Sequence, residues 1–308
     1  MAGAPGGAVA EAPNPVIAMQ NLAQLAVSGI AQGMIYAVIA FGYQLTFGTS
    51  RTLNFGQGEA LMLGALTGLT VAGQVGYWAM IPVVLLFGAA QGYVVERLGV
   101  APAIKTKSEF GWIMSTIALG IIFRNTAEII WGKDDIKFPS PLPEAPLKLL
   151  GIRVLPMELL VVVGALAMML AVEVFNRRSI YGKAVVATSN DRDAAGLMGI
   201  NTGVVISFSY MLSSLTAALA GVLVAPLTLT GASMGSVLGL KAFAVAIIGG
   251  LNSGLGVIVG GLILGIAEST TGYYLSTGYK DVPGLILLLL VLAVKPSGLF
   301  GKTSIKKV

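Results

Sequence analysis

Three long stretches of this chain carry no acidic or basic side chain: residues 60–91, 204–239 and 242–267. A helix needs ~20 apolar residues to cross the hydrocarbon layer of a membrane, so each stretch is long enough to do so. The stretches are continuously apolar, whereas strands of a membrane barrel alternate over ~10 residues. Together with a mean hydropathy of +0.86, they predict an all-α, polytopic integral membrane protein.

The apolar segments predict about eight to ten transmembrane or re-entrant helices. We expect helices at residues 22–47, 60–72, 78–98, 110–131, 156–175, 204–224, 241–250, 254–274 and 283–294. Residues 225–240 are rich in Gly, Ser, Thr and Pro, which favours a broken or re-entrant piece. We expect three parts: a flexible N-terminal tail at 1–21, a transmembrane domain at 22–301 and a basic cytoplasmic tail at 302–308.

The distribution of basic residues indicates which helix ends face the cytoplasm. Three basic residues lie in 97–107, four in 177–192 and four in 295–307. The long loop 133–153 has four basic and three acidic residues, a weaker bias. We therefore expect the first three segments in the cytoplasm and the long loop outside. Because the charges are dispersed between apolar spans, the net charge of +5 does not predict nucleic-acid binding.

Several chemistries are disfavoured by what the sequence lacks. It has no cysteine and no histidine, so disulfides are excluded and a metal centre, a histidine proton relay or an intramembrane enzyme is not expected. Near the C-terminus, PSGLFGKTS resembles a phosphate-binding loop, but Pro296 stands where that motif requires glycine. We expect no catalytic residue, no metal and no cofactor on this chain, and any ATP on another chain.

Glycines four residues apart, as at Gly29 and Gly33 or Gly261 and Gly265, predict close helix packing. Two glycine-bearing interruptions, residues 55–69 and 248–265, resemble each other weakly and predict two pseudo-repeated halves with a substrate route between them. The alternative is a chance similarity between glycine-rich membrane helices.

Ionisable residues inside apolar segments are costly in lipid and normally face a partner, a cavity or water. Arg124 and Glu128 lie four apart on one predicted helix and are expected to pair. The residues at the two interruptions could line a transport path or anchor the fold, and the sequence favours neither alternative. The candidate path residues are Asn54, Gly56, Gln57, Gly58, Glu59, Lys241, Asn252, Ser253 and Glu268.

A polar island, ATSNDRDAAGLMGIN at 187–201, interrupts the apolar pattern. Its Asp193-Ala194-Ala195-x-x-x-Gly199 resembles, with Asp for Glu, the E-A-A-x-x-x-G signature of the cytoplasmic loop of binding-protein-dependent ABC importers. The two alanines predict a compact helix, an acid at its start suits the helix dipole, and the glycine permits a terminating positive φ. The alternative is a solvated loop. The candidate coupling residues, in a loop at 177–203, are Lys183, Asp191, Arg192, Asp193, Ala194, Ala195 and Gly199.

After about residue 22, the chain resembles the LivH-type permeases of branched-chain amino acid ABC transporters. The resemblance rests on the segments YAVIAFGYQLTFG (36–48), LNFGQGEALMLGA (53–65), YGKAVVATSNDRDAAGLMGIN (181–201), GLKAFAVAIIGGLNSGLGVIVGGLILGIAE (239–268) and KPSGLFG (295–301).

The resemblance implies an importer in the bacterial inner membrane. It implies a LivM-type second permease in a heterodimer, two LivF/LivG-type subunits that bind ATP and Mg, and a periplasmic amino-acid-binding protein. The family often has histidine in the stretch that holds Gln57 here, which leaves the substrate open between amino acids, urea and short amides. A stand-alone ion-coupled carrier, with Glu268 as its protonatable acid, is the rival class.

Overall fold

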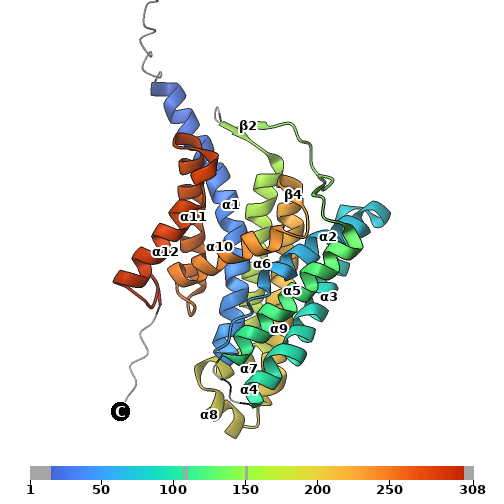
Figure 1. The fold of residues 1–308 in the computed structure, drawn as a ribbon. Helices are drawn as coiled ribbons and strands as arrows, with labels where there is room; N and C mark the ends of the chain where they lie inside the picture. The colour runs from blue at the N-terminus through green and yellow to red at the C-terminus, as the bar shows by residue number, and fades with distance from the viewer. Residues whose placement is uncertain (1–14, 107, 109, 150–151, 302–308) are drawn as a thin grey trace, which may run out of the picture.

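A computed structural model of the chain describes residues 15–106, 108, 110–149 and 152–301. Within these residues the protein is a bundle of long helices, shown in Figure 1. Seven of the described helices are long and apolar enough to cross a membrane. Two further apolar helices, α2 (Gln57–Val75) and α10 (Met234–Gly249), pack among them, so the described residues contain nine such helices, within the predicted eight to ten. The all-α, polytopic fold class is confirmed.

Helix α1 (Pro15–Ser50) runs through the centre of the bundle. It begins earlier than the predicted residue 22, with Pro15 at its first turn, a position where proline is compatible with a helix. Residues 1–14 and 302–308, which include most of the predicted tails, lie outside the described residues. The predicted glycine packing is confirmed: Gly29 and Gly33 lie against the backbone of Gly265 and Gly261.

The first half continues, after a break at residues 51–56, with a run of helices that are joined by short turns. They are α2, α3 (Tyr77–Val95), a π-helical turn (Glu96–Val100), α4 (Ala101–Lys105) and α5 (Gly111–Trp131). The sharp turn from α2 to α3 is made by Gly76, whose φ of 82° suits glycine because it has no Cβ.

A long connection at residues 132–155 lies at one end of the bundle. It holds β1 (Ile136–Lys137), β2 (Leu147–Leu149) and β3 (Ile152–Val154); β2 pairs antiparallel with β3, and β1 with β4 (Leu229–Thr230). Phe138, fully buried, anchors the connection to the bundle. On its surface the Lys137 ammonium, 2.7 Å from the Glu144 carboxylate, lowers the pKa of Glu144.

The second half begins with α6 (Pro156–Arg178) and continues to residue 294. Its further elements are α7 (Ile180–Asn190), α8 (Arg192–Leu197), α9 (Thr202–Val224), η2 (Ala225–Leu227), β4, α10, α11 (Gly254–Tyr274), η3 (Thr277–Tyr279) and α12 (Val282–Val294). Helices α4, α7 and α8 lie at the end opposite the long connection (Figure 1).

The prediction of a broken piece at residues 225–240 was wrong in its extent. A 3₁₀ turn and β4 occupy its first part, but α10 runs without interruption from Met234 to Gly249 and includes Lys241. Glycines at 235 and 239 serve close helix packing here rather than a break. The break at residues 250–253 is confirmed: Gly250 has a φ of 100°, and α11 starts at Gly254. The pseudo-repeat stays a prediction.

Candidate translocation face and coupling elbow

The break between α1 and α2 is held by a buried polar network. Asn54 and Gln57 are both fully buried. The backbone N–H of Gly56 donates to Asn54 Oδ1 at 3.0 Å, a turn that suits asparagine. Gln57 Nε2 donates to the carbonyl of Ser213 on α9 at 3.0 Å, and Ser213 Oγ donates to the carbonyl of Gly42 on α1 at 2.8 Å. These amides therefore fix the break in place rather than face an open cavity.

The first turn of α2 lies directly against the first turn of α10. A Cβ added at Gly58 would lie well under 3.0 Å from the carbonyl of Gly235, and one at Gly235 would meet the carbonyl of Gly58 in the same way. The two backbones are thus in contact with no side chain between them. We call this crossing the α2–α10 seam. It is a form of close approach that only small residues allow.

Beside the α2–α10 seam is a cavity of about 180 Å³. Glu59 lines it together with Phe55 of the break and Ser236 of α10. On the other side, Glu59 faces Gly120 of α5. Of the predicted path residues, Gly58 and Glu59 are the two that border this cavity. Ser236 could not be predicted here from local sequence, because it follows Glu59 by 177 positions.

Lys241 and Glu268 form a second, separate cluster. The Lys241 ammonium lies 2.9 Å from Glu268 and 2.6 Å from Asp281, and Tyr36 Oη donates to the same Glu268 oxygen at 2.7 Å. Glu268 is 5% exposed. Lys241 and Glu268 lie on either side of the break at residues 250–253, as predicted, but Lys241 lies inside α10 rather than at the start of a helix at residue 241. The cluster ties α10 to α1, α11 and the start of α12, which supports the anchoring alternative for these two residues.

Asn252 and Ser253 lie in a third place, at the turn between α10 and α11. Ser253 Oγ accepts from the backbone N–H of Gly256 at 3.1 Å and so caps α11. The structure therefore divides the predicted path residues among the break, the Lys241 cluster and this turn, and does not gather them in one site.

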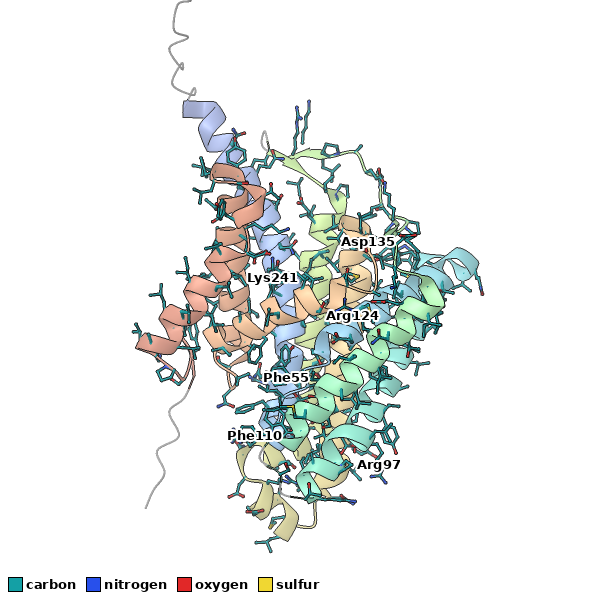
Figure 2. The ribbon with its side chains drawn as sticks, in the orientation of Figure 1. Phe55, Arg97, Phe110, Arg124, Asp135 and Lys241 are labelled. Carbon is teal, nitrogen blue, oxygen red and sulfur yellow. The ribbon has the colours of Figure 1, made fainter. Side chains whose placement is uncertain are left out.

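Helix α5 presents polar side chains on an open face. The predicted pair is confirmed, with Arg124 Nε 3.5 Å from Glu128 Oε1, and the Arg124 side chain is 44% exposed. Asn125 and Thr126 are also exposed, each bonded back to its own helix. Figure 2 shows Phe55 and Arg124 near mid-height of the bundle. Charged and amide groups at membrane depth are costly against lipid, so this face needs a protein or aqueous neighbour.

The polar island lies in a helical elbow that α7 and α8 form, instead of in an irregular loop. Asp191 Oδ1 accepts from the backbone N–H groups of Asp193 and Ala194 at 3.0 and 2.9 Å, so it is the N-cap of α8. Gly199 has a φ of 86°, as predicted, and Ile200 N donates to the carbonyl of Ala195 at 3.1 Å. This pattern is that of a Schellman cap.

The elbow has a buried root and an exposed tip. Ala195 is 5% exposed, whereas Leu197 and Met198 are 90% and 83% exposed. Lys183, Arg192, Asp193 and Ala194 are exposed as well. Sequence reasoning missed Leu197 and Met198, although two large apolar residues inside a polar island were the available signal. An apolar tip that is surrounded by charges is typical of a protein-binding surface.

The elbow is packed onto the end of α1. Arg51 Nη2 donates to the carbonyl of Ser189 on α7 at 3.5 Å, and Gly48 lies against the Ser189 side chain. Arg51 is the first residue of the break and has a φ of 57°, which is unusual for a residue with a Cβ. A displacement of the elbow would therefore reach the break directly.

The apolar bundle, with seven described helices long enough to cross a membrane, defines a multi-pass membrane protein. Residues 25–294 match the family described as branched-chain amino acid transport system / permease component. The chain belongs to this family.

Sequence similarity to individual permeases supports this assignment. The chain is 32% identical to the high-affinity branched-chain amino acid transport system permease protein LivH of Escherichia coli strain K12, with 91% of this chain and 96% of that protein covered. It is 30% identical to BraD of Pseudomonas aeruginosa, with 92% and 97% covered. LivM of E. coli is 25% identical, with 88% and 68% covered.

One solved structure is also similar. PsaBC from Streptococcus pneumoniae in complex with Fab has a TM-score of 0.49 and 15% identity, with 88% of this chain and 91% of that chain covered.

Proposed function

We propose that this chain is one half of a transmembrane pathway for a small amino acid in an ABC importer of the bacterial inner membrane. In this assembly a LivM-type permease is its partner, two further subunits bind ATP and Mg and hydrolyse the ATP, and a periplasmic protein delivers the amino acid. The chain itself performs no covalent chemistry. The elbow and the C-terminus face the cytoplasm, and the long connection faces the periplasm.

The observation that carries this proposal is the connection between the elbow and the break. The elbow exposes Leu197 and Met198 at its tip. Its helix α7 contacts Arg51 through the carbonyl of Ser189, where α1 ends and the break begins. A motion imposed on the tip by an ATP-binding subunit is thereby passed to the first turn of α2. Alternating access needs such a mechanical link and no catalytic residue in the permease.

The pathway lies on the face that α5, the break and α10 share. Polar side chains such as Arg124 and Asn125 are open there, and the second permease subunit would cover them. Glu59 borders both α5 and the cavity at the α2–α10 seam. Glu59→Gln therefore lowers uptake by the reconstituted transporter, and unchanged uptake would remove Glu59 from the path.

The proposal is tested by reconstituting the chain with the presumed partners in proteoliposomes. Leu197→Asp and Asp193→Lys are expected to reduce co-purification of the ATP-binding subunits and ATP hydrolysis that depends on the binding protein. Asp134→Lys, the same charge change on an exposed residue of the opposite loop, is the matched control and keeps the subunits associated. ATP hydrolysis that ignores both the binding protein and Asp193→Lys would contradict the proposal.

A further inference from the structure

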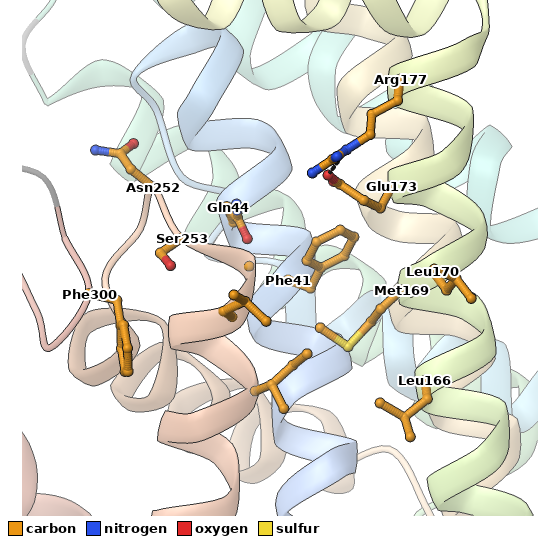
Figure 3. Close-up of a pocket in the computed structure, with 13 residues that line it drawn as sticks. Phe41, Gln44, Leu166, Met169, Leu170, Glu173, Arg177, Asn252, Ser253 and Phe300 are labelled. Carbon is orange, nitrogen blue, oxygen red and sulfur yellow. Dashed lines mark hydrogen bonds and ion pairs between the residues drawn. The ribbon is translucent and has the colours of Figure 1, made fainter.

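A large groove outside the pathway face lies between α6 and α11, with α1 as its floor. Its volume is about 650 Å³, within the roughly 300–1,000 Å³ of small-molecule sites. Figure 3 shows the groove from its open side. None of the residues at the α2–α10 seam lines it. It is therefore separate from the pathway proposed above.

The groove has an apolar part and a polar end. Leu166, Met169, Leu170, Leu255 and Ile258 form the apolar part. Leu170 and Leu255 are 63% and 73% exposed, so they would contact lipid chains in a membrane. The polar end comprises Gln44, Glu173, Arg177, Asn252 and Ser253. An elongated amphiphile with one polar end fits this division.

The polar end carries one positive charge, on Arg177, and one negative charge, on Glu173. Arg177 Nε lies 2.6 Å from Glu173 Oε1, and both side chains remain accessible, at 76% and 48%. The first turn of α11 begins at the same end of the groove, and its free N–H groups favour a phosphate. An acidic, a basic and an N–H-rich element together are complementary to a zwitterion that carries a phosphate and an ammonium.

A buried acceptor without a partner supports an ammonium at this site. Gln44 Oε1 is buried, and among the described residues no donor lies within hydrogen-bond distance of it. Gln44 lines the groove next to Phe41 on α1. Buried polar atoms normally have a partner. Because Gln44 Oε1 itself has almost no exposed surface, the amide turns towards the groove when it accepts from an ammonium there.

We propose that this groove binds a zwitterionic glycerophospholipid of the phosphatidylethanolamine type. One acyl chain lies along the apolar part. The phosphate binds between Arg177 and the first turn of α11, and the ammonium lies between Glu173 and Gln44. The position of Arg177 at the end of α6 next to the elbow places the headgroup in the leaflet that the elbow faces. The bound lipid thus fills the groove between α6 and α11.

Native mass spectrometry of the full-length chain, released from vesicles of equal phosphatidylethanolamine and phosphatidylglycerol, tests the proposal. We expect one retained phosphatidylethanolamine per chain and at least a fivefold preference over phosphatidylglycerol. Leu170→Trp, which fills the groove from an exposed position, abolishes retention. Leu289→Trp on α12, where the replaced leucine is 66% exposed and lies outside the groove, retains the lipid as the wild type does.

The charge of the polar end gives an independent test. Glu173→Gln removes the acidic element, leaves Arg177 and gives the site a net positive charge. Retention should then shift from phosphatidylethanolamine towards the anionic phosphatidylglycerol. Equal retention of both lipids by the wild type, or an unchanged preference in Glu173→Gln, would overturn the proposal. None of these readouts depends on transport, so failure here and failure of the proposed function are distinguishable.

Discussion

The α2–α10 seam permits a sharp test of the packing, by adding one methyl group. Gly58→Ala places a Cβ well under 3.0 Å from the carbonyl oxygen of Gly235 and 3.2 Å from the Cα of Gly239. Ordinary contacts between such atoms are ~3.5–4.0 Å. Because the atoms that would be struck belong to backbone, no side chain can rotate away, and the two helices must separate.

Overpacking of this kind costs about 1–3 kcal/mol. Alanine also has a higher helix propensity than glycine, by about 0.5–1 kcal/mol, which acts in the opposite direction. Gly73→Ala is the matched control: it lies in the same helix, and no atom lies within 4 Å of its added Cβ. The propensity gain acts at both positions, so the difference between the two variants reports the seam.

The measurement is unfolding of the purified chain in mixed micelles with increasing sodium dodecyl sulfate. Gly58→Ala is expected to unfold at a lower detergent fraction than the wild type, and Gly73→Ala at an equal or higher one. In proteoliposomes with the partner subunits, uptake should fall for Gly58→Ala alone. If the two variants unfold at the same midpoint, the backbones of α2 and α10 are not in contact.

Three further substitutions test the anchoring cluster and the elbow. Lys241→Met leaves Glu268, 5% exposed, without its cation and should lower the free energy of unfolding by about 3–5 kcal/mol, measured in the same micelles. Asp191→Ala removes the N-cap of α8 at a cost of about 0.5–2 kcal/mol, visible as faster amide exchange in α8; equal exchange in wild type and variant would contradict the cap. Gly199→Ala forces a side chain to a φ of 86° at about 1–2 kcal/mol and should likewise speed exchange, whereas unchanged exchange would mean that the turn relaxes freely.

Much of the fold could be predicted because hydropathy is a local property of the sequence. The apolar segments matched the long helices, and the ion pair of Arg124 with Glu128 followed from their spacing on one helix. Glycine was harder to interpret. At Gly250 it allows a positive φ and ends α10, but at Gly235 it only allows α2 to come close. Glycine therefore serves both purposes. Which one applies depends on the helix packed against it, and the local sequence does not show which helix that is.

The candidate site was predicted less completely because its contacts are distant in sequence. Lys241 and Glu268 were identified as costly charges, but their shared partner Tyr36 precedes Lys241 by 205 positions. The amide of Gln57 was expected at a path, and it is instead bound to the backbone of Ser213 on α9. Buried polar residues in a membrane protein mark either a route or an anchor, and the sequence alone does not separate the two.

The two kinds of contact made by α10 determine where the pathway can open. Through Lys241, α10 forms ion pairs with α11 and the start of α12 and a hydrogen bond with Tyr36 of α1, and breaking that cluster would leave buried charges unpaired. At Gly235 it meets α2 through backbone alone, and separating two glycine surfaces removes dispersion contacts but no buried ion pair. The elbow touches the end of α1 at Gly48 and the first residue of the break, Arg51. A force from the elbow therefore separates α2 from α10 at the seam more readily than it moves α10 from the helices behind it.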